Sequence, residues 1–377
     1  MALSPRRLNR ATLARQLLLR RAPVDVVGAV RRVVALQAQE PASPYLALWN
    51  RVDGFDPADL DAAFADGELV KAPLMRITLH AVDARDYTAF HEAMVASLRA
   101  SRLHDRRYTS TGLTTADADA VLPHVVAFAS RPRTKAEIEE LLGEHVGAPP
   151  EPRLWWALRT FAPLAHAPTG GPWSFGPRPS FVAAPTVPAR LDPGQALRRL
   201  VRRYLEGFGP ASAEDIARFT LQRRTVVRET LRAMADELTT VEGPGGVELA
   251  DVPGGELPDE DTPAPARLLG MWDSILLAYA DRSRIIPDEH RREVIRRNGD
   301  VLPTLLVDGE VRGVWRPLED GIEALAFERL TDETWDALAG EARGLLTLLA
   351  ARDPAVYGRY GHWWSKLPGA EVRVLRG

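Results

Sequence analysis

The chain of 377 residues contains no cysteine. This absence excludes disulfide bonds, metal sites built from thiolates and cysteine nucleophiles. The sequence also lacks any run near the roughly 20 apolar residues that cross a membrane, and its first residues lack the apolar stretch of a secretory signal. The composition, 45% hydrophobic and 26% charged, is typical of globular proteins. We therefore expect a cytoplasmic protein with no membrane partner, long enough for two or three domains.

Lysine is also scarce, since only Lys71, Lys135 and Lys366 occur and the other basic residues are arginine. The arginines form tight clusters, at positions 6–7, 31–32, 198–203 and 291–297. Arg198 and Arg202 lie one helical turn apart, as do Arg199 and Arg203, so this helix carries a basic face. The net charge is −3. Two interpretations stay open: the clusters contact a phosphate backbone on one side of the molecule, or they pair with nearby acidic residues.

Several common catalytic patterns are missing. The sequence has no G-x-x-x-x-G-K loop, no G-x-S-x-G, and no nucleotide-binding G-x-G-x-x-G followed by a helix. The eight histidines include no pair at zinc-ligand spacing. We therefore expect no metal and no cofactor.

The most informative stretch is residues 24–44, which begin as an amphipathic helix after Pro23. Gln37 falls where the apolar stripe would continue, and Gln39 follows it before Pro41 ends any helix. In a continued helix the two amides would diverge by roughly 200°. In a chain that is extended from about residue 37, they would face the same side. The alternative is that Gln37 caps the helix and Gln39 is a solvated loop residue.

The chain alternates helices with short strand pairs, the outline of a winged helix. Strands are predicted within 69–79 and a hairpin at 241–252. Asn9, Thr134 (with Glu137) and Ser212 are expected to cap helices. The predicted helices span residues 10–19, 117–129, 135–142, 152–161, 195–208, 212–219 and 222–237. The pattern predicts three units, at 1–110, 111–190 and 191–256, and the acidic, proline-rich stretch 257–266 then leads to a strand-rich region, 267–377.

A further hairpin is predicted in the C-terminal region. Two apolar runs meet at Asp308–Gly309, the residue pair that best suits a type I′ turn. Arg312 lies close to this tip. The compact, charged tip is a candidate binding element.

Four segments carry a resemblance to a known family: LQAQEPASPYLALWNR (36–51), MRITLHAVDARDY (75–87), GMWDSILLAYADRSRIIP (270–287) and VDGEVRGVW (307–315). Together they resemble the winged-helix DNA glycosylases of the AlkZ type, and the likeness spans most of the chain. It implies a helix-rich α+β fold in which three tandem winged-helix motifs form a curved, DNA-embracing surface. It also implies that the Gln–apolar–Gln motif, here Gln37 and Gln39, carries the activity. Relatives include versions with an acidic second position, and this chain matches the amide version.

Arg76 and His80 belong to the family-like segment MRITLH. If this segment is a strand, residues 76, 78 and 80 share a face and could approach the same cleft as the glutamines. Given the resemblance, Arg76 and His80 are DNA-binding candidates, and we predict that the Asp308–Gly309 tip, with Arg312, also contacts DNA. The alternative is a strand whose polar side lies in water.

The resemblance implies a monofunctional enzyme that hydrolyses the N-glycosidic bond of N7-alkylated guanine, including azinomycin-type interstrand crosslinks, in DNA repair or self-resistance. A purine alkylated at N7 already carries positive charge and leaves as a neutral base, so no strong acid is required. Two amide oxygens can hold the attacking water. No lysine lies in the glutamine segment, which argues against a lysine nucleophile, and Glu40 is expected to be a surface charge. We expect a monomer that binds double-stranded DNA and leaves an abasic site; the alternative is a non-catalytic winged-helix transcription regulator.

Overall fold

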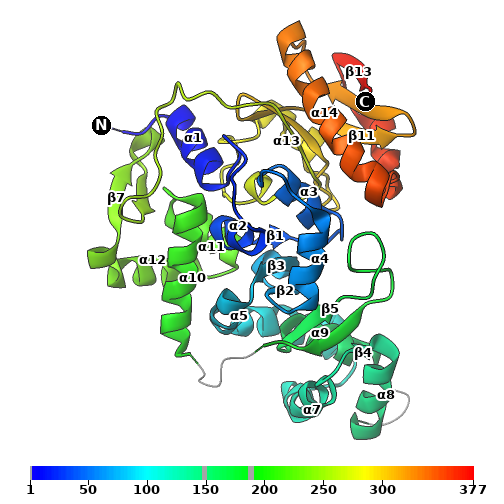
Figure 1. Ribbon diagram of the computed structural model, residues 1–377. Coiled ribbons are helices and arrows are strands. Elements are labelled where there is room, and N and C mark those ends of the chain that lie inside the picture. Colours follow the sequence, from blue (N-terminus) through cyan, green and yellow to red (C-terminus); the bar gives the residue numbers. More distant parts are fainter. Residues whose placement is uncertain (1, 147–150, 186–190) are drawn as a thin grey trace.

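The structure, a computed structural model, describes residues 2–146, 151–185 and 191–377. The chain forms a helix-rich α+β fold with several small antiparallel sheets. Figure 1 shows the N-terminal part, drawn in blue, at the centre of the molecule, with the segment around α7 and α8 at one end and the C-terminal region with α14 at the other. No helix in these described ranges is long and apolar enough to cross a membrane.

The first unit contains the glutamine segment. Its elements follow one another as α2 (Val26–Val33), β1 (Leu36–Gln37), α3 (Ser43–Trp49), α4 (Pro57–Ala65), β2 (Leu69–Pro73) and β3 (Leu79–Asp83). All strands pair antiparallel, and β3 lies between β1 and β2. The unit is therefore helix, strand, two helices and a strand pair, with the last strand at the centre of the sheet.

The same order recurs twice among the described residues. The second unit contains α7 (Thr115–Phe128), β4 (Arg133–Thr134), α8 (Lys135–Val146), α9 (Pro152–Phe161), β5 (Leu164–Ala167) and β6 (Ser180–Ala183), in the sheet order β4-β6-β5. The third contains α10 (Pro193–Phe208), α11 (Ala213–Thr220), α12 (Arg224–Ala233), β7 (Thr239–Glu242) and β8 (Glu248–Asp251). Ala211 bridges Ala250 in β8, so residue 211 occupies the place that β1 and β4 take in the other units. Helices followed by antiparallel strands therefore recur along the described part of the chain.

Local capping signals explain where several helices start. Thr134 and Glu137 exchange hydrogen bonds before α8, as predicted, and Ser212 caps α11 in the same way with Asp215. The prediction for Asn9 is wrong. Helix α1 spans Pro5–Arg15 and is capped by Ser4, whose hydroxyl accepts from the Arg7 amide at 3.1 Å. Ser4 followed by proline is a complete start signal one turn earlier.

Two helices join the first unit to the second: α5 (Ala84–Leu103) and α6 (Arg106–Thr109). The predicted strands within 69–79 are present only in part, because the 3₁₀ turn η1 (Met75–Ile77) interrupts them and β3 starts at Leu79. The predicted boundary between the second and third units, after residue 190, adjoins residues 186–190, which are not described.

The C-terminal region, which was predicted to be rich in strands, contains a five-stranded sheet. Its strands are β9 (Arg267–Leu269), β10 (Thr304–Val307), β11 (Glu310–Leu318), β12 (Gly321–Ala326) and β13 (Glu371–Leu375), in the order β13-β12-β11-β10-β9. Helix α14 (Asp332–Arg352), which buries Trp335, Leu338 and Leu345, was not predicted from the sequence. The short helices of this region are η4 (Ser274–Leu276), η5 (Asp288–His290), α13 (Arg291–Val294) and η6 (Gly358–Lys366), while η2 (Ala235–Glu237) and η3 (Pro244–Gly246) belong to the third unit.

The buried side chains form two large clusters. One joins the first unit to the C-terminal sheet and α14, through residues such as Leu46, Leu268 and Trp315. The other joins the second and third units to the far side of the first. The first unit therefore lies between the two cores, which fixes the position of its strand β1 and of Gln37.

Candidate active site

The backbone around Gln37 settles how the two glutamines are presented. Helix α2 ends at Val33, and Val34 has a φ of 76°, a conformation that breaks the helix. The chain then becomes extended, with Gln37 opposite His80, and the Ala38 amide donates to the Leu79 carbonyl at 2.7 Å. Of the two backbone paths left open by the sequence, the extended one is present over Leu36–Gln37, after which Gln39 and Glu40 lie in a bend. Side chains along it alternate between the two faces of the sheet.

Gln37 is buried, with 4% of its surface exposed, and its amide is held by a charged partner. The Nη2 atom of Arg76 donates to Gln37 Oε1 at 2.6 Å and lies 3.3 Å from His80 Nε2. Arg76 reaches this position from a turn, with a φ of 55°, so the segment MRITLH is not the continuous strand that we considered. The structure nevertheless brings Arg76 and His80 to the first glutamine of the motif.

The charge state of this cluster follows from burial. Desolvation, with repulsion from Arg76, lowers the pKa of His80 to about 3, so the imidazole is neutral. Its Nδ1 lies 3.0 Å from the Thr78 carbonyl and donates to it, which leaves Nε2 as an acceptor for Arg76. Desolvation and the charge of Arg282 lower the pKa of Arg76 to about 9. Arg76 also lies over the ring of Phe219, 4.8 Å from its centroid.

Gln39 differs from Gln37 in its surroundings. It is exposed, and its amide makes no hydrogen bond within the part of the chain that the structure describes. The amide can therefore bind water or a ligand with all its donors and acceptors. The motif thus consists of one fixed amide and one open amide, two residues apart.

Glu40, the neighbouring acid, is already engaged. Its carboxylate accepts from the Tyr360 hydroxyl at 2.9 Å and forms an ion pair with Arg359. These contacts connect the end of the glutamine motif to η6 in the C-terminal region. Glu40 is a structural anchor, and its carboxylate is not free to act as a base.

A buried ion pair fixes the same region from the other side. Arg51, after α3, donates through both terminal nitrogens to the carboxylate of Asp273, each at 2.7 Å, and both side chains are fully buried. Next to Asp273, the Ser274 hydroxyl donates to the Ala35 carbonyl at 2.8 Å. The segment that leads into Gln37 is therefore attached directly to the C-terminal region.

The Asp308–Gly309 hairpin forms as predicted, since both residues have the positive φ of a type I′ turn, 48° and 84°. Its tip packs on α1. Asp308 pairs with Arg6 at 2.8 Å and with Arg10, and the Gly309 carbonyl accepts from Asn9 at 2.7 Å.

Arg312, on the same hairpin, pairs with Glu310 at 2.6 Å and with Glu328 at 2.8 Å. Contact of this tip with DNA stays a prediction. The polar groups involved already have partners within the chain.

The arginine cluster on α10 has acidic partners. Arg198 and Arg202 both pair with Glu237, and Arg199 and Arg203 both pair with Asp86. The structure therefore favours the second of the two interpretations for this helix. Its charges stabilise contacts within the chain.

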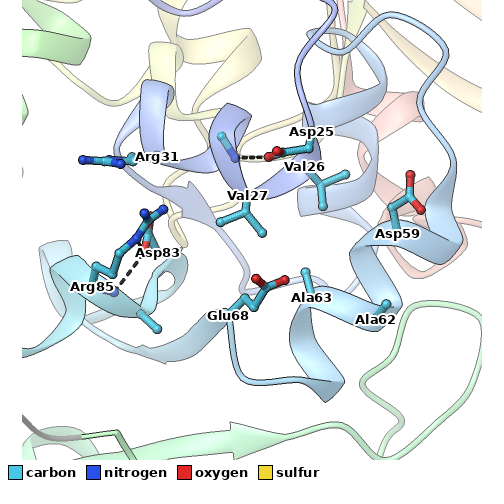
Figure 2. Close-up of a pocket in the computed structure, with 12 residues that line it drawn as sticks. Asp25, Val26, Val27, Arg31, Asp59, Ala62, Ala63, Glu68, Asp83 and Arg85 are labelled. Atoms are coloured by element: carbon cyan, nitrogen blue, oxygen red, sulfur yellow. Dashed lines mark hydrogen bonds and ion pairs between the residues drawn. The ribbon is translucent and has the colours of Figure 1, made fainter.

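A hollow on another part of the surface, shown in Figure 2, does not include the glutamine motif. Asp25 in this hollow caps α2, and Asp83 pairs with Arg85. The lining carries four carboxylates and two guanidinium groups, from Asp25, Asp59, Glu68, Asp83, Arg31 and Arg85. An excess of negative charge does not suit a DNA phosphate. The better candidate site is the surface around Gln37 and Gln39.

Comparison with known proteins defines the class to which this fold and site belong. The chain is a member of the AlkZ-like family of DNA glycosylases, whose sequence model matches residues 30–348. It is thus an enzyme that acts on N-glycosyl bonds, and the resemblance seen in the sequence is confirmed.

A similar sequence and a similar solved structure both come from Streptomyces sahachiroi. An interstrand DNA cross-link repair glycosylase is 26% identical over 322 residues, which cover 80% of this chain and 84% of that protein. The solved structure of the DNA glycosylase AlkZ matches with a TM-score of 0.81 and 24% identity, over 93% of this chain and 98% of the other. The latter likeness shows that the two proteins share a fold.

Proposed function

We propose that this protein is a monofunctional DNA glycosylase that releases N7-alkylated guanine, with Gln37 and Gln39 as the catalytic residues. The supporting observation is that one amide of the motif is fixed and the other is open. Arg76 donates to Gln37 Oε1 at 2.6 Å, and Gln39 is exposed two residues further along the chain. The product is an abasic site in double-stranded DNA. The protein acts as a monomer.

The surroundings of the glutamines suit a base that needs no protonation to leave. His80 is neutral, and the Glu40 carboxylate is held by Tyr360 and Arg359. Neither side chain can serve as a strong acid at neutral pH. An N7-alkylated purine carries its own positive charge, so the barrier that remains belongs to the cationic sugar and the attacking water. Amide oxygens can orient that water and direct their dipoles toward the developing charge.

The register of the first sheet supports hydrolysis by water over attack by lysine. Lys71 aligns with Ala81 and Leu36, whereas Gln37 aligns with His80 and Ala72. Adjacent rows of a sheet point to opposite faces, so Lys71 lies on the other side of the sheet from Gln37. Burial lowers the pKa of Lys71 to about 7, and its ammonium lies 4.0 Å from the centroid of Phe175. We assign it to packing between the first two units.

The repeated order of elements supports three tandem winged-helix motifs, which we assign to residues 1–110, 111–190 and 191–256, with 267–377 as the C-terminal region. Each unit presents a helix, a strand or bridge, two helices and a hairpin, with the last strand central. In the first unit the first strand carries Gln37.

The substrate class extends to interstrand crosslinks. This extension rests on the relative from S. sahachiroi that is named a cross-link repair glycosylase and, for azinomycin-type adducts, on the family resemblance of the glutamine segment. The alternative of a non-catalytic transcription regulator is not favoured, because the chain belongs to a glycosylase family.

The test is base release in vitro. Purified protein is incubated with a duplex that contains a single N7-methylguanine and, in parallel, with a duplex carrying an N7-linked interstrand crosslink, followed by alkaline cleavage at abasic sites. We expect strand breaks at the modified guanine in at least one substrate, and none in the undamaged duplex. Tight binding to one DNA sequence without base release from either substrate would support the regulator.

The dependence of the rate on pH gives an independent prediction. Amides do not titrate, the pKa of His80 is about 3, and the pKa of Arg76 is about 9. None of the three side chains Gln37, Arg76 and His80 therefore changes charge between about pH 5 and pH 8. Single-turnover release of N7-methylguanine should vary less than about threefold over this range. A bell-shaped dependence of the rate on pH, with a pKa near 6 or 7, would instead show that a general acid or base takes part in the reaction.

A further inference from the structure

A group of arginines without acidic partners lies beside the glutamine site. It consists of Arg218 on α11, Arg282 in the loop after Tyr279, and Arg291 at the start of α13. Their guanidinium groups make no ion pair and no hydrogen bond with the described part of the chain. This sets them apart from the arginines of α10, each of which pairs with a carboxylate.

Arg218 and Arg291 each lie close enough to Arg282 to repel its charge. Burial, then Arg218 and Arg291, lower the pKa of Arg282 to about 10. Arg282 in turn acts on Arg76, which donates to Gln37. The charges thus form a continuous group that extends from the first catalytic amide to α13.

Two of the guanidinium groups have donors with no acceptor. The Nε atom of Arg282 and the Nη1 atom of Arg76 are both buried and make no hydrogen bond among the described residues. A buried donor without an acceptor costs free energy, and an arginine cannot avoid the cost by losing its proton at neutral pH. Such an arrangement is stabilised when an anion binds.

The fold holds the group in place before any ligand binds. The Ala280 amide donates to Asp215 of α11 at 2.8 Å, and the Arg282 carbonyl accepts from the Ile286 amide at 2.8 Å. The ring of Phe219, next to Arg218 in α11, lies under Arg76. Helix α11 and the loop after Tyr279, which are far apart in sequence, are therefore held together with their arginines close to Arg76.

We propose that Arg218, Arg282 and Arg291 form a binding site for a phosphodiester of the DNA duplex, next to the damaged nucleotide. Guanidinium forks match the oxygens of a phosphate in geometry and charge. The proposal rests on the proposed function, in which positive charge develops on the sugar close to Arg76. A phosphate bound at this site offsets the repulsion between that charge and the arginines.

The experiment measures how strongly binding depends on salt. Affinity for an undamaged duplex is determined by fluorescence anisotropy at several chloride concentrations for the wild type, Arg282→Ala and Arg218→Ala/Arg282→Ala/Arg291→Ala. Arg343→Ala is the control, because Arg343 is exposed on α14 and makes no ion pair with the described residues. Undamaged DNA requires no base release, so this result does not depend on whether the protein acts on N7-alkylguanine.

We expect the slope of log affinity against log salt to become shallower by about 0.9 for Arg282→Ala, the value for one lost phosphate contact, and by more for the triple variant. Arg343→Ala should keep the wild-type slope. If Arg282→Ala and the triple variant also keep that slope, the phosphodiester assignment is wrong. It is also wrong if inorganic phosphate, at constant ionic strength, raises the melting temperature of the wild type but not of Arg282→Ala while DNA binding is unchanged, since the site would then hold free phosphate.

Discussion

Replacing Gln37 or Gln39 by alanine should lower the single-turnover rate of N7-methylguanine release by about 10²–10³-fold, the usual effect of removing one preorganised polar group that stabilises a transition state. Gln39→Ala is easier to interpret than Gln37→Ala, because the Gln39 side chain is exposed and has no partner among the described residues. Its loss should leave DNA affinity and melting temperature close to those of the wild type.

Gln37→Ala needs a stability measurement beside the rate. It removes the acceptor of Arg76, which costs on the order of 1–3 kcal/mol. Gln195→Ala is a suitable control, since Gln195 is exposed near the start of α10 and far along the chain from the motif. If Gln39→Ala releases the base at the wild-type rate, or if Gln195→Ala slows it equally, the assignment of the motif is wrong.

The largest effect on stability is expected at the buried pair Arg51–Asp273. Arg51→Ala or Asp273→Ala should lower the free energy of unfolding by about 3–5 kcal/mol, because each change leaves the other charge buried without its partner. Chemical denaturation measures this loss. The pair Arg376–Asp320, in which both side chains are mostly exposed, provides the control, and Arg376→Ala should cost at most about 1 kcal/mol.

The same pair separates the effect of charge from the effect of packing. The double variant Arg51→Met/Asp273→Leu removes both charges and keeps apolar volume, so it should recover most of the stability lost in either single variant. It would lose the hydrogen bond from Arg51 to the Ala47 carbonyl. Equal stability of Arg51→Ala and the wild type would show that the pair does not hold the first unit to the C-terminal region.

Features that depend on neighbouring residues could be predicted from the sequence. The capping boxes at Thr134 and Ser212 and the turn at Asp308–Gly309 each need only three or four consecutive residues. The helix-rich α+β character, with helices alternating with short strand pairs, follows from hydrophobic periodicity in the same way. The extended path through Gln37 was one of two possibilities, and Val34, with its positive φ, decides between them.

Contacts between distant segments could not be predicted. Arg76 meets Gln37 from a turn that interrupts the expected strand. The hairpin tip at Asp308 packs on α1, and nothing in the sequence of the hairpin predicts its ion pair with Arg10. Arg282 was one arginine among many, and only the fold shows that it has no acidic partner among the described residues. Helix α14 was missed even though Trp335, Leu338 and Leu345 recur at helical spacing, because the whole region was interpreted as strand-rich.

The central claim is that the two amides act together on one water, and single-turnover rates of Gln37→Ala, Gln39→Ala and the double variant test it most directly. If both amides hold the same water, removing either one removes its orientation, and the double variant should be no more than about threefold slower than the slower single variant. Rate losses that multiply in the double variant would show that the glutamines act independently. Single variants with the wild-type rate would show that neither holds the attacking water.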